Sequence, residues 1–160
     1  MSIKVNLIGL GVMGRPMARN MAKAGFDVVS YTPSIGSRER ARADGLVVVD
    51  SLAALPAEPD FVVTVVPDSP EVEEVLFADD GPVARSSENT IFVDMSTIAP
   101  GAARAIGARL GELGRRFLDA PVSGGESGAV DGILSIMVGG DEETFATAKP
   151  MFEAMGTTVV

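Results

Sequence analysis

The amino-acid sequence predicts a doubly wound α/β fold, in which helices flank both faces of a mostly parallel sheet. Short apolar, β-branched segments alternate with helical patterns over all 160 residues, and this alternation is typical of a parallel sheet. A glycine-rich turn directly follows the first apolar segment and leads into a helical one. Together these observations predict one Rossmann-type, dinucleotide-binding domain over residues 1–160.

The strands are expected where short segments combine apolar and β-branched residues. The first is Ile3–Ile8, which runs straight into Gly9–Gly14 and a helix. Phe61–Val66 is almost continuously apolar, as in a strand that helices cover on both faces. The other expected strands are Val28–Tyr31, Leu46–Val49, Ile91–Asp94, Phe117–Asp119, Ile133–Val138 and Thr157–Val160.

The later helices are expected to begin at capping residues. The pairs of cap and helix are Ser37 with Arg38–Asp44, Ser69 with a helix that has Pro70 at its first position, and Asp141 with Glu142–Ala148. Ala99–Leu113 is the longest helical pattern, and its Ala and Leu spacing suits a helix that lies on a sheet. Asp79–Asn89 is polar and irregular, so it is predicted to be a surface loop.

The composition excludes several kinds of chemistry. The chain has no Cys and no His, and its formal net charge is −9. Without Cys there is no disulfide or thiol nucleophile, and without His any proton must move through Lys, Asp, Glu, Tyr or water. The negative charge argues against a nucleic-acid surface. With no signal-peptide pattern and no bilayer-length apolar run, we expect a cytoplasmic protein without a membrane partner or a metal site.

The glycine-rich turn has the spacing of a dinucleotide-binding loop. Gly9 permits the tight turn out of the strand, Gly11 lets a pyrophosphate approach the backbone, and Gly14 allows the helix to pack closely on the strand. The loop also contains Leu10, Val12 and Met13. Because the strand, loop and helix occur in the required order, dinucleotide binding is favoured over a merely structural turn or a site for another nucleotide.

The end of the second strand bears on the choice between NADP(H) and NAD(H). An NAD site places Asp or Glu there, but this chain has Tyr31 and Thr32, and Asp27 stands at the opposite end of the strand. Ser34 and Arg38 follow, with Arg40 and Arg42 nearby, and hydroxyl and guanidinium groups suit a 2′-phosphate. NADP(H) is therefore favoured, although the arginines could instead only solvate a helix face.

Two further strand ends are expected to meet the ligand, because ligands of open α/β sheets lie at the carboxyl ends of the strands. Val66 and Pro67 close the fourth strand, and Ser96 and Thr97 follow the fifth. The two hydroxyl groups could contact a nicotinamide or its ribose. One of them could instead cap the helix that begins near Pro100, and both roles are compatible.

The segment Asp119–Gly125 follows another predicted strand and ends in Ser123, Gly124 and Gly125. A hydroxyl group and several backbone N–H groups close together form a nest that suits an anion such as a substrate carboxylate. The alternative is a flexible turn. Ser123 is not expected to be an acyl-transfer nucleophile, because the chain contains neither His nor a G-x-S-x-G sequence.

With these motifs in order, the chain resembles the N-terminal NAD(P)-binding domain of the β-hydroxyacid dehydrogenases over nearly all of its length. Gly9–Gly25 resembles the cofactor signature of that family, Asp119–Gly125 its substrate signature, and Gly132–Gly140 the strand that follows. Within the family, Asp94–Pro100 and Gly132–Gly140 are most similar to tartronate semialdehyde reductase (2-hydroxy-3-oxopropionate reductase), with 3-hydroxyisobutyrate dehydrogenase next. The domain of 6-phosphogluconate dehydrogenase that binds NADP is a related one.

The resemblance implies hydride transfer between the nicotinamide and a small carboxylate substrate, either a 3-hydroxy acid or its semialdehyde. It implies that Leu10–Met13 cradle the cofactor, that Val66 and Pro67 line it, that Ser96 or Thr97 meets the nicotinamide side, and that Ser123, Gly124 and Gly125 hold the substrate carboxylate. Tyr31–Ser34 departs from the family, whose members usually carry Asp-Arg or Asn-Arg at this position.

The resemblance also implies that the general acid/base is a lysine on a long helix beyond Val160, because none of Lys4, Lys23 and Lys149 matches the family motif. We therefore expect no catalytic residue within the chain and no reductase activity from the chain alone. The all-helical C-terminal domain of the family, through which the full-length parent is expected to form a homo-oligomer, also lies outside the chain. Without it, Met137, Met151 and Met155 are expected to form an exposed apolar patch.

Two alternatives remain beside a hydroxyacid dehydrogenase. An imine reductase-like protein would share the glycine loop but would not need a carboxylate nest at Ser123. A non-catalytic module could bind NADP(H) without carrying out a reaction.

Overall fold

The computed structural model describes residues 2–160 and confirms the α/β fold class. A seven-stranded sheet has the order β3-β2-β1-β4-β5-β6-β9, and its first six strands, all parallel, follow the 3-2-1-4-5-6 order of the doubly wound fold. The seven strands of this sheet are β1 Lys4–Ile8, β2 Asp27–Tyr31, β3 Val47–Val48, β4 Phe61–Thr64, β5 Ile91–Asp94, β6 Arg116–Asp119 and β9 Gly139–Gly140.

The carboxyl ends of the central strands lie side by side. Ile8 pairs in register with Tyr31 on one side and with Thr64 on the other, and Thr64 pairs in turn with Asp94, which pairs with Asp119. The residues that follow β1, β2, β4, β5 and β6 therefore emerge at one edge of the sheet. The strand order reverses between β1 and β4, where open α/β sheets hold their ligands.

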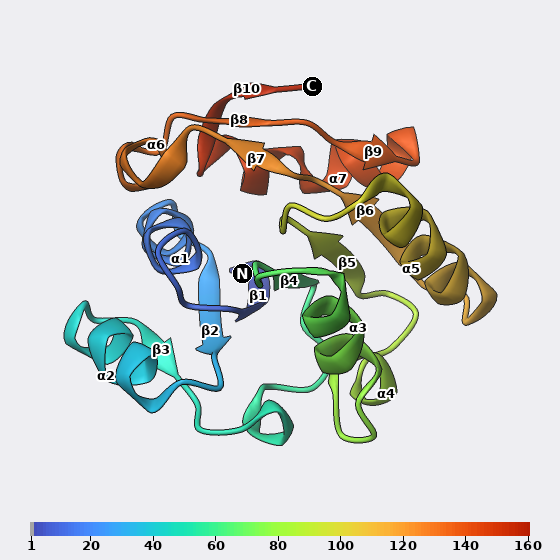
Figure 1. Ribbon diagram of the computed structural model, residues 1–160, viewed down its shortest axis with the longest axis horizontal. Coiled ribbons are helices and arrows are strands. Elements are labelled where there is room, and N and C mark those ends of the chain that lie inside the picture. The colour runs from blue at the N-terminus through green and yellow to red at the C-terminus, as the bar shows by residue number, and fades with distance from the viewer. Residues whose placement is uncertain (1) are drawn as a thin grey trace.

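Helices cover both faces of this sheet, as Figure 1 shows. The helices are α1 Gly14–Lys23, α2 Ile35–Ala43, α3 Ser69–Phe77, α4 Pro82–Arg85, α5 Pro100–Glu112, α6 Gly125–Asp131 and α7 Glu142–Glu153, with a short 3-10 helix at Leu52–Ala54. Residues of α1, α2 and α7 share one buried apolar cluster with the sheet, and residues of α3, α4 and α5 share the other. Two-sided burial explains why Phe61–Thr64 is apolar or fully buried at every position.

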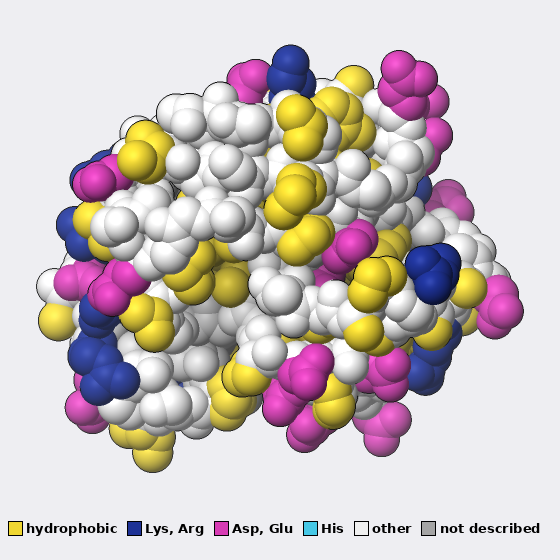
Figure 2. Space-filling model, turned by 45° about the horizontal axis from the view of Figure 1, so that its top comes forward, with side chains coloured by type: hydrophobic (Ala, Val, Ile, Leu, Met, Phe, Trp, Pro, Cys, Tyr) yellow, Lys and Arg dark blue, Asp and Glu magenta, His cyan; other side chains and the backbone are white. Residues whose placement is uncertain are grey.

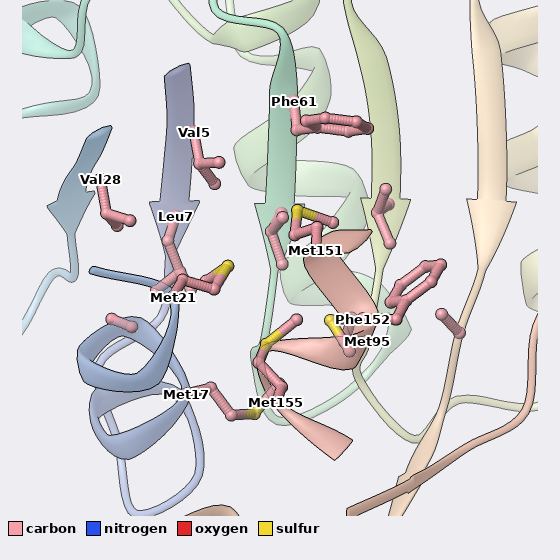
Figure 3. Packing of buried hydrophobic residues seen from close by; sticks show 14 of the residues in the cluster. Val5, Leu7, Met17, Met21, Val28, Phe61, Met95, Met151, Phe152 and Met155 are labelled. Atoms are coloured by element: carbon pink, nitrogen blue, oxygen red, sulfur yellow. The ribbon is translucent and has the colours of Figure 1, made fainter. Parts of the chain in front are cut away.

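The first cluster is rich in methionine. Figure 3 shows Met17 and Met21 of α1 and Met151 and Phe152 of α7 within this cluster, with the strands behind them. Met151 and Met155 are 1% and 0% exposed, so the expected apolar patch is wrong for these two residues, whereas Met137 is 48% exposed. The reason is that α7 packs against the main sheet and buries its apolar face there.

The C-terminal third differs from the single sheet that the sequence predicts. The expected strand Ile133–Val138 is shortened to β8 Leu134–Ile136, and β9 follows beyond its expected end. β8 pairs with β7 Val122–Ser123 and β10 Gly156–Val159 in a separate three-stranded sheet. Only β9 joins the main sheet, antiparallel to β6. Its glycines allow this close approach, because a Cβ on Gly140 would lie 2.7 Å from Cδ2 of Leu118.

Two helix starts differ from the prediction by a few residues. Ser34 rather than Ser37 caps α2, because the Ser34 hydroxyl accepts a hydrogen bond from the Ser37 N–H at 3.3 Å. Asp68 rather than Ser69 caps α3, and its carboxylate accepts from the Ser69 N–H at 2.7 Å. Ser34 and Asp68 each have an extended backbone and directly precede the first helical residue, as the geometry of an N-cap requires. Asp141 caps α7 as predicted, through the Thr144 N–H at 2.8 Å.

The segment Asp79–Asn89 is not the irregular surface loop that its polar composition predicts. It contains α4, in which Pro82 and Val83 are buried. The Arg85 guanidinium donates to the carbonyl oxygens of Leu52 and Leu55 at 3.2 and 2.8 Å. Long-range contacts of this kind leave no local pattern in the sequence. Over residues 2–160, no helix is long and apolar enough to cross a membrane.

Candidate functional site

A pocket of about 490 Å³ opens at the carboxyl ends of β1, β2 and β4. Its walls come from the glycine loop, from the segment after β2, and from the end of β4 with α3. The lining residues are Ile8–Gly14, Thr32–Ser34, Ser37, Val65–Pro67, Glu71, Glu74 and Val75. Ten of the seventeen residues of the predicted nucleotide and substrate sites therefore lie together: Gly9–Gly14, Thr32, Ser34, Val66 and Pro67.

The glycine loop is packed so tightly that two of its positions exclude a side chain. Gly9 has a φ of +110°, and a Cβ there would overlap the carbonyl oxygen of Val65, on the other side of the switch between β1 and β4. A Cβ on Gly14 would in turn overlap the carbonyl oxygen of Gly9. The absence of these two side chains allows the loop to pack directly on the residue after β4, and the start of α1 to pack directly on the loop.

Gly11 has the opposite surroundings. No heavy atom lies within 4 Å of the position that its Cβ would take, and the residue lines the pocket. The packing of the protein therefore does not require a glycine at position 11. The open space is what the close approach of a pyrophosphate to the backbone requires, so the residues present fit a dinucleotide.

The first turn of α1 offers hydrogen-bond donors to the same space. Its N-cap residue, Met13, lines the pocket and makes no side-chain capping bond, and the first turn contains no acidic residue. The Arg15 N–H already donates to the Gly11 carbonyl at 3.2 Å and Pro16 has no N–H, so the donors left here are the N–H groups of Met13 and Gly14. Together with the positive end of the helix dipole they favour an anion at this position.

The arginines after β2 are engaged to different degrees. Arg38 donates from Nε to the Thr32 carbonyl at 2.8 Å and from Nη2 to the Pro33 carbonyl at 2.9 Å, and its guanidinium lies 5.7 Å from the centre of the Tyr31 ring. Neither Tyr31 nor Arg38 lines the pocket. Arg38 thus fixes the backbone of the Thr32–Ser34 turn, and this turn lines the pocket.

Asp50 draws two of these arginines together. It lies 3.3 Å from Nη1 of Arg38 and 2.9 Å from Nη2 of Arg42. The hydrogen bond from Arg42 is the main cause that holds the pKa of Asp50 below its ordinary value. Arg40 instead donates to the hydroxyl of Ser37, a lining residue, at 3.2 Å, and within residues 2–160 no carboxylate lies within 4.0 Å of it.

The opposite wall contains residues that the sequence analysis missed. Glu71 and Glu74 of α3 line the pocket, and Oε2 of Glu71 is buried without a hydrogen-bond partner in the structure. Figure 2 shows the hollow in this face, with Lys and Arg side chains at its left margin and Asp and Glu side chains at the lower right. In the sequence, the three-residue spacing of Glu71 and Glu74 is compatible with one face of a helix, but it does not indicate which segment that face contacts.

Ser96 and Thr97 follow β5, and neither lines the pocket. Ser96 is buried, and its hydroxyl accepts a hydrogen bond from the N–H of Val66 at 2.8 Å. Thr97 is exposed. Neither residue caps α5, because the N-cap is Ala99 and no side chain bonds to that helix start. The predicted capping role is therefore wrong, and contact with the nicotinamide stays a prediction.

Ser123, Gly124 and Gly125 are exposed and lie outside the 490 Å³ pocket. Ser123 ends β7, and Gly124 and Gly125, the N-cap and first residue of α6, have φ values of +140° and +63°. The side chain of Asn20 in α1 donates to the carbonyl of Ala129 in α6 at 2.7 Å, which ties this segment to the helix that follows the glycine loop. Carboxylate binding here stays a prediction.

Two carboxyl groups lie at the ends of β5 and β6, the buried Asp94 and the half-buried Asp119. Asp94 and Asp119 pair in register, and each has one buried oxygen without a partner, Oδ2 of Asp94 and Oδ1 of Asp119. Burial raises the pKa of Asp94, against the hydrogen bonds from Ser96 and Thr64 that lower it. Burial also raises the pKa of Asp119, and the charge of Asp94 adds to that rise.

The lysines lie apart from the pocket. Lys4 belongs to β1, Lys23 ends α1, and Lys149 in α7 lies 3.7 Å from the carboxylate of Glu153. None of the three lines the pocket.

Comparison with known proteins identifies a family. The model of the NAD binding domain of 6-phosphogluconate dehydrogenase matches residues 4–160. The 2-hydroxy-3-oxopropionate reductase of Escherichia coli is 43% identical over 158 residues, which cover 98% of this chain and 53% of the relative. The NAD-dependent L-serine dehydrogenase of Pseudomonas aeruginosa is 42% identical over 161 residues, which cover 98% of this chain and 52% of the relative.

Solved structures agree with these relatives. The 3-hydroxyisobutyrate dehydrogenase of Mycobacterium tuberculosis, solved with L-serine, has a TM-score of 0.92 and 38% identity over 100% of this chain and 54% of its own. An imine reductase from Myxococcus stipitatus has a TM-score of 0.90 at 18% identity over 100% of this chain and 54% of its own, which shows a shared fold alone. The chain thus spans about half the length of the relatives that it matches.

The raised pKa of Asp119 predicts how stability depends on pH. The folded state keeps this proton to a higher pH than the unfolded state, so the free energy of unfolding falls as pH rises from 3.8 through the raised pKa. We expect Asp119→Asn to lose less stability than the wild type over this window. Urea unfolding between about pH 4 and 8 measures the difference.

Asp50→Asn is the matched control, because the pKa of Asp50 is lowered instead. The contribution of Asp50 is present above 3.8 and is lost as pH falls through its lowered pKa, so this variant should lose less stability on acidification. Parallel stability curves for Asp119→Asn and the wild type would contradict the role assigned to Asp119.

Proposed function

The chain belongs to the family of the NAD binding domain of 6-phosphogluconate dehydrogenase, and from that premise we propose that it holds the dinucleotide of a hydroxyacid dehydrogenase. The whole protein would transfer a hydride between the nicotinamide and a small 3-hydroxy acid or its semialdehyde. The relatives named 2-hydroxy-3-oxopropionate reductase and 3-hydroxyisobutyrate dehydrogenase support this class of substrate.

The observation that carries the proposal is the arrangement around Gly11. The loop is held against β4 by the close packing of Gly9 and Gly14, while Gly11 itself faces open space beside the uncapped start of α1. A bound dinucleotide would supply the hydride or accept it. The chain would supply backbone N–H donors for the pyrophosphate and an apolar wall at Val65–Pro67.

Ser123, Gly124 and Gly125 are proposed to hold the substrate carboxylate. Their support is the match to the substrate signature of the family and the two consecutive positive φ angles, which turn backbone N–H groups toward one side. Their place outside the 490 Å³ pocket is compatible with a substrate that binds beside the cofactor rather than in its pocket.

NADP(H) is the proposed cofactor in preference to NAD(H). No acid ends β2, and Thr32, Ser34 and Ser37 line the pocket rim there. Arg40 bonds to Ser37 and has no acidic partner among residues 2–160, so it is better placed than Arg38 to meet a 2′-phosphate. Arg38 contributes to the site through the turn that it holds.

The general acid/base is proposed to lie outside these 160 residues. The position of all three lysines away from the pocket supports this, as does the fact that the relatives are about twice as long as the chain. The whole protein is further proposed to form a homo-oligomer, as the family resemblance implies.

Gly11→Ala tests dinucleotide binding. Because nothing lies within 4 Å of the added methyl group, we expect the melting temperature to be unchanged, while the affinity for NADPH falls about tenfold or more. Titration by calorimetry measures the affinity. Gly111→Ala in α5 is the control, since its Cβ also meets nothing within 4 Å and Gly111 does not line the pocket. Equal binding by Gly11→Ala and the wild type would overturn the proposal.

Arg40→Ala tests the choice of cofactor. Loss of a charge-assisted contact to the 2′-phosphate should lower the affinity for NADPH about tenfold and leave that for NADH unchanged. Arg38→Ala should weaken both cofactors alike, because it releases the Thr32–Pro33 turn. If Arg40→Ala changes the two affinities by the same factor, the 2′-phosphate is not held by this side chain.

The activity of the chain alone tests the position of the proton donor. With NADPH bound, we expect reduction of tartronate semialdehyde or glyoxylate to be slower by about 10²–10⁴-fold than with a full-length relative. The decrease in NADPH absorbance measures the rate, and calorimetry confirms that the cofactor is bound. A rate equal to that of the relative would place the proton donor within the chain.

A further inference from the structure

Asp94 is completely buried at the end of β5, and its carboxylate organises two neighbouring groups. Oδ1 accepts a hydrogen bond from the Thr64 hydroxyl at 2.9 Å and another from the Ser96 N–H at 3.1 Å. The first bond reaches across to the end of β4, and the second fixes the turn that follows β5. One oxygen atom therefore sets the relative positions of two strand ends.

Ser96 extends this network to the pocket. Its hydroxyl accepts from the N–H of Val66 at 2.8 Å and lies 3.5 Å from the carbonyl oxygen of Thr64. Val66 and Pro67 form part of the pocket wall. The preceding residue, Val65, is already bound through its N–H to Ile8 in β1 at 2.9 Å. Because Pro67 has no N–H, the Val66 N–H is the backbone donor of the Val66–Pro67 segment.

We propose that Asp94 is a positioning residue of the dinucleotide pocket, which acts through the Ser96 hydroxyl to hold Val66 and Pro67 in place at the switch between β1 and β4. This inference rests on the proposed function of the pocket. Asp94 does not line the pocket, so it touches no ligand there. Its effect on the ligand is transmitted by two consecutive hydrogen bonds.

Stability alone does not account for a carboxyl group at this position. A buried polar oxygen without a partner costs free energy, and Oδ2 of Asp94 is such an atom. Next to it in register lies Asp119, a second acid with an unpartnered buried oxygen. What Asp94 supplies in return is an acceptor for Thr64 and Ser96, which an apolar side chain of the same size could not provide.

Ser96→Ala and Asp94→Ala remove the two links separately, and Asp94→Asn keeps an oxygen that can accept both bonds. We expect the two alanine variants to bind NADPH about three- to tenfold more weakly than the wild type, and Asp94→Asn to retain its affinity. Amide hydrogen exchange measured by NMR should accelerate at Val66 in both alanine variants. The Val65 amide, bonded to Ile8, should stay protected.

Thr90→Val is the matched control. Thr90 is buried at the opposite end of the same strand pair, where its hydroxyl donates to the Pro59 carbonyl at 2.7 Å. Its loss should lower the melting temperature without changing the affinity for NADPH. The control thus separates general destabilisation of β4 and β5 from a displaced pocket wall. If Asp94→Ala does not fold, Ser96→Ala decides the test.

The outcomes distinguish this inference from the proposed function. If the wild-type chain binds neither NADPH nor NADH, the proposed function fails, and the role of Asp94 fails with it. If the wild type binds NADPH but Ser96→Ala binds equally well, only the role of Asp94 is overturned. The same holds if Thr90→Val weakens binding as much as Ser96→Ala does.

Discussion

The close packing of the glycine loop against the end of β4 is the constraint on which the rest of the site depends. A side chain on Gly9 would overlap the Val65 carbonyl, and one on Gly14 would overlap Gly9, so the loop, β4 and α1 can approach one another only without side chains. This approach aims the start of α1 at the space beside Gly11. It also places that space where the strand order reverses, so that residues from β2 and α3 can reach it.

Charge is distributed around this site in a way that a net value of −9 does not reveal. On one rim, Asp50 neutralises Arg38 and Arg42 while Arg40 keeps no acidic partner within residues 2–160. On the other wall stand Glu71 and Glu74. At the ends of β5 and β6, Asp94 is buried and Asp119 is half-buried, and burial raises the pKa of both. An acidic chain therefore carries a local cluster of arginines on one side of the pocket and carboxylates on the other.

Much of the candidate site could be predicted from the sequence, because many of its residues directly follow a strand in the chain. The glycine spacing, the absence of an acid after β2 and the residues Val66 and Pro67 each follow directly from a strand, and the structure brings them into one pocket. Glu71 and Glu74 could not be found in this way, because their role depends on which face of α3 meets the loop. Arg38 and Ser96 were identified as residues near the ligand, but their hydrogen bonds turn them toward the backbone of the pocket walls.

By itself, the sequence determined the alternation of strands and helices, the parallel sheet and the glycine loop, because these follow from local hydrophobic periodicity and from steric limits at single residues. Only the tertiary structure decided which elements share a sheet and which side chains are committed to one another. The separate sheet of β7, β8 and β10, the burial of Met151 and Met155, and the helix at Pro82–Arg85 all depend on contacts between segments far apart in the chain. Hydrogen bonds such as that from Val66 to Ser96 join residues 30 positions apart, and no pattern along the chain specifies such a distance in space.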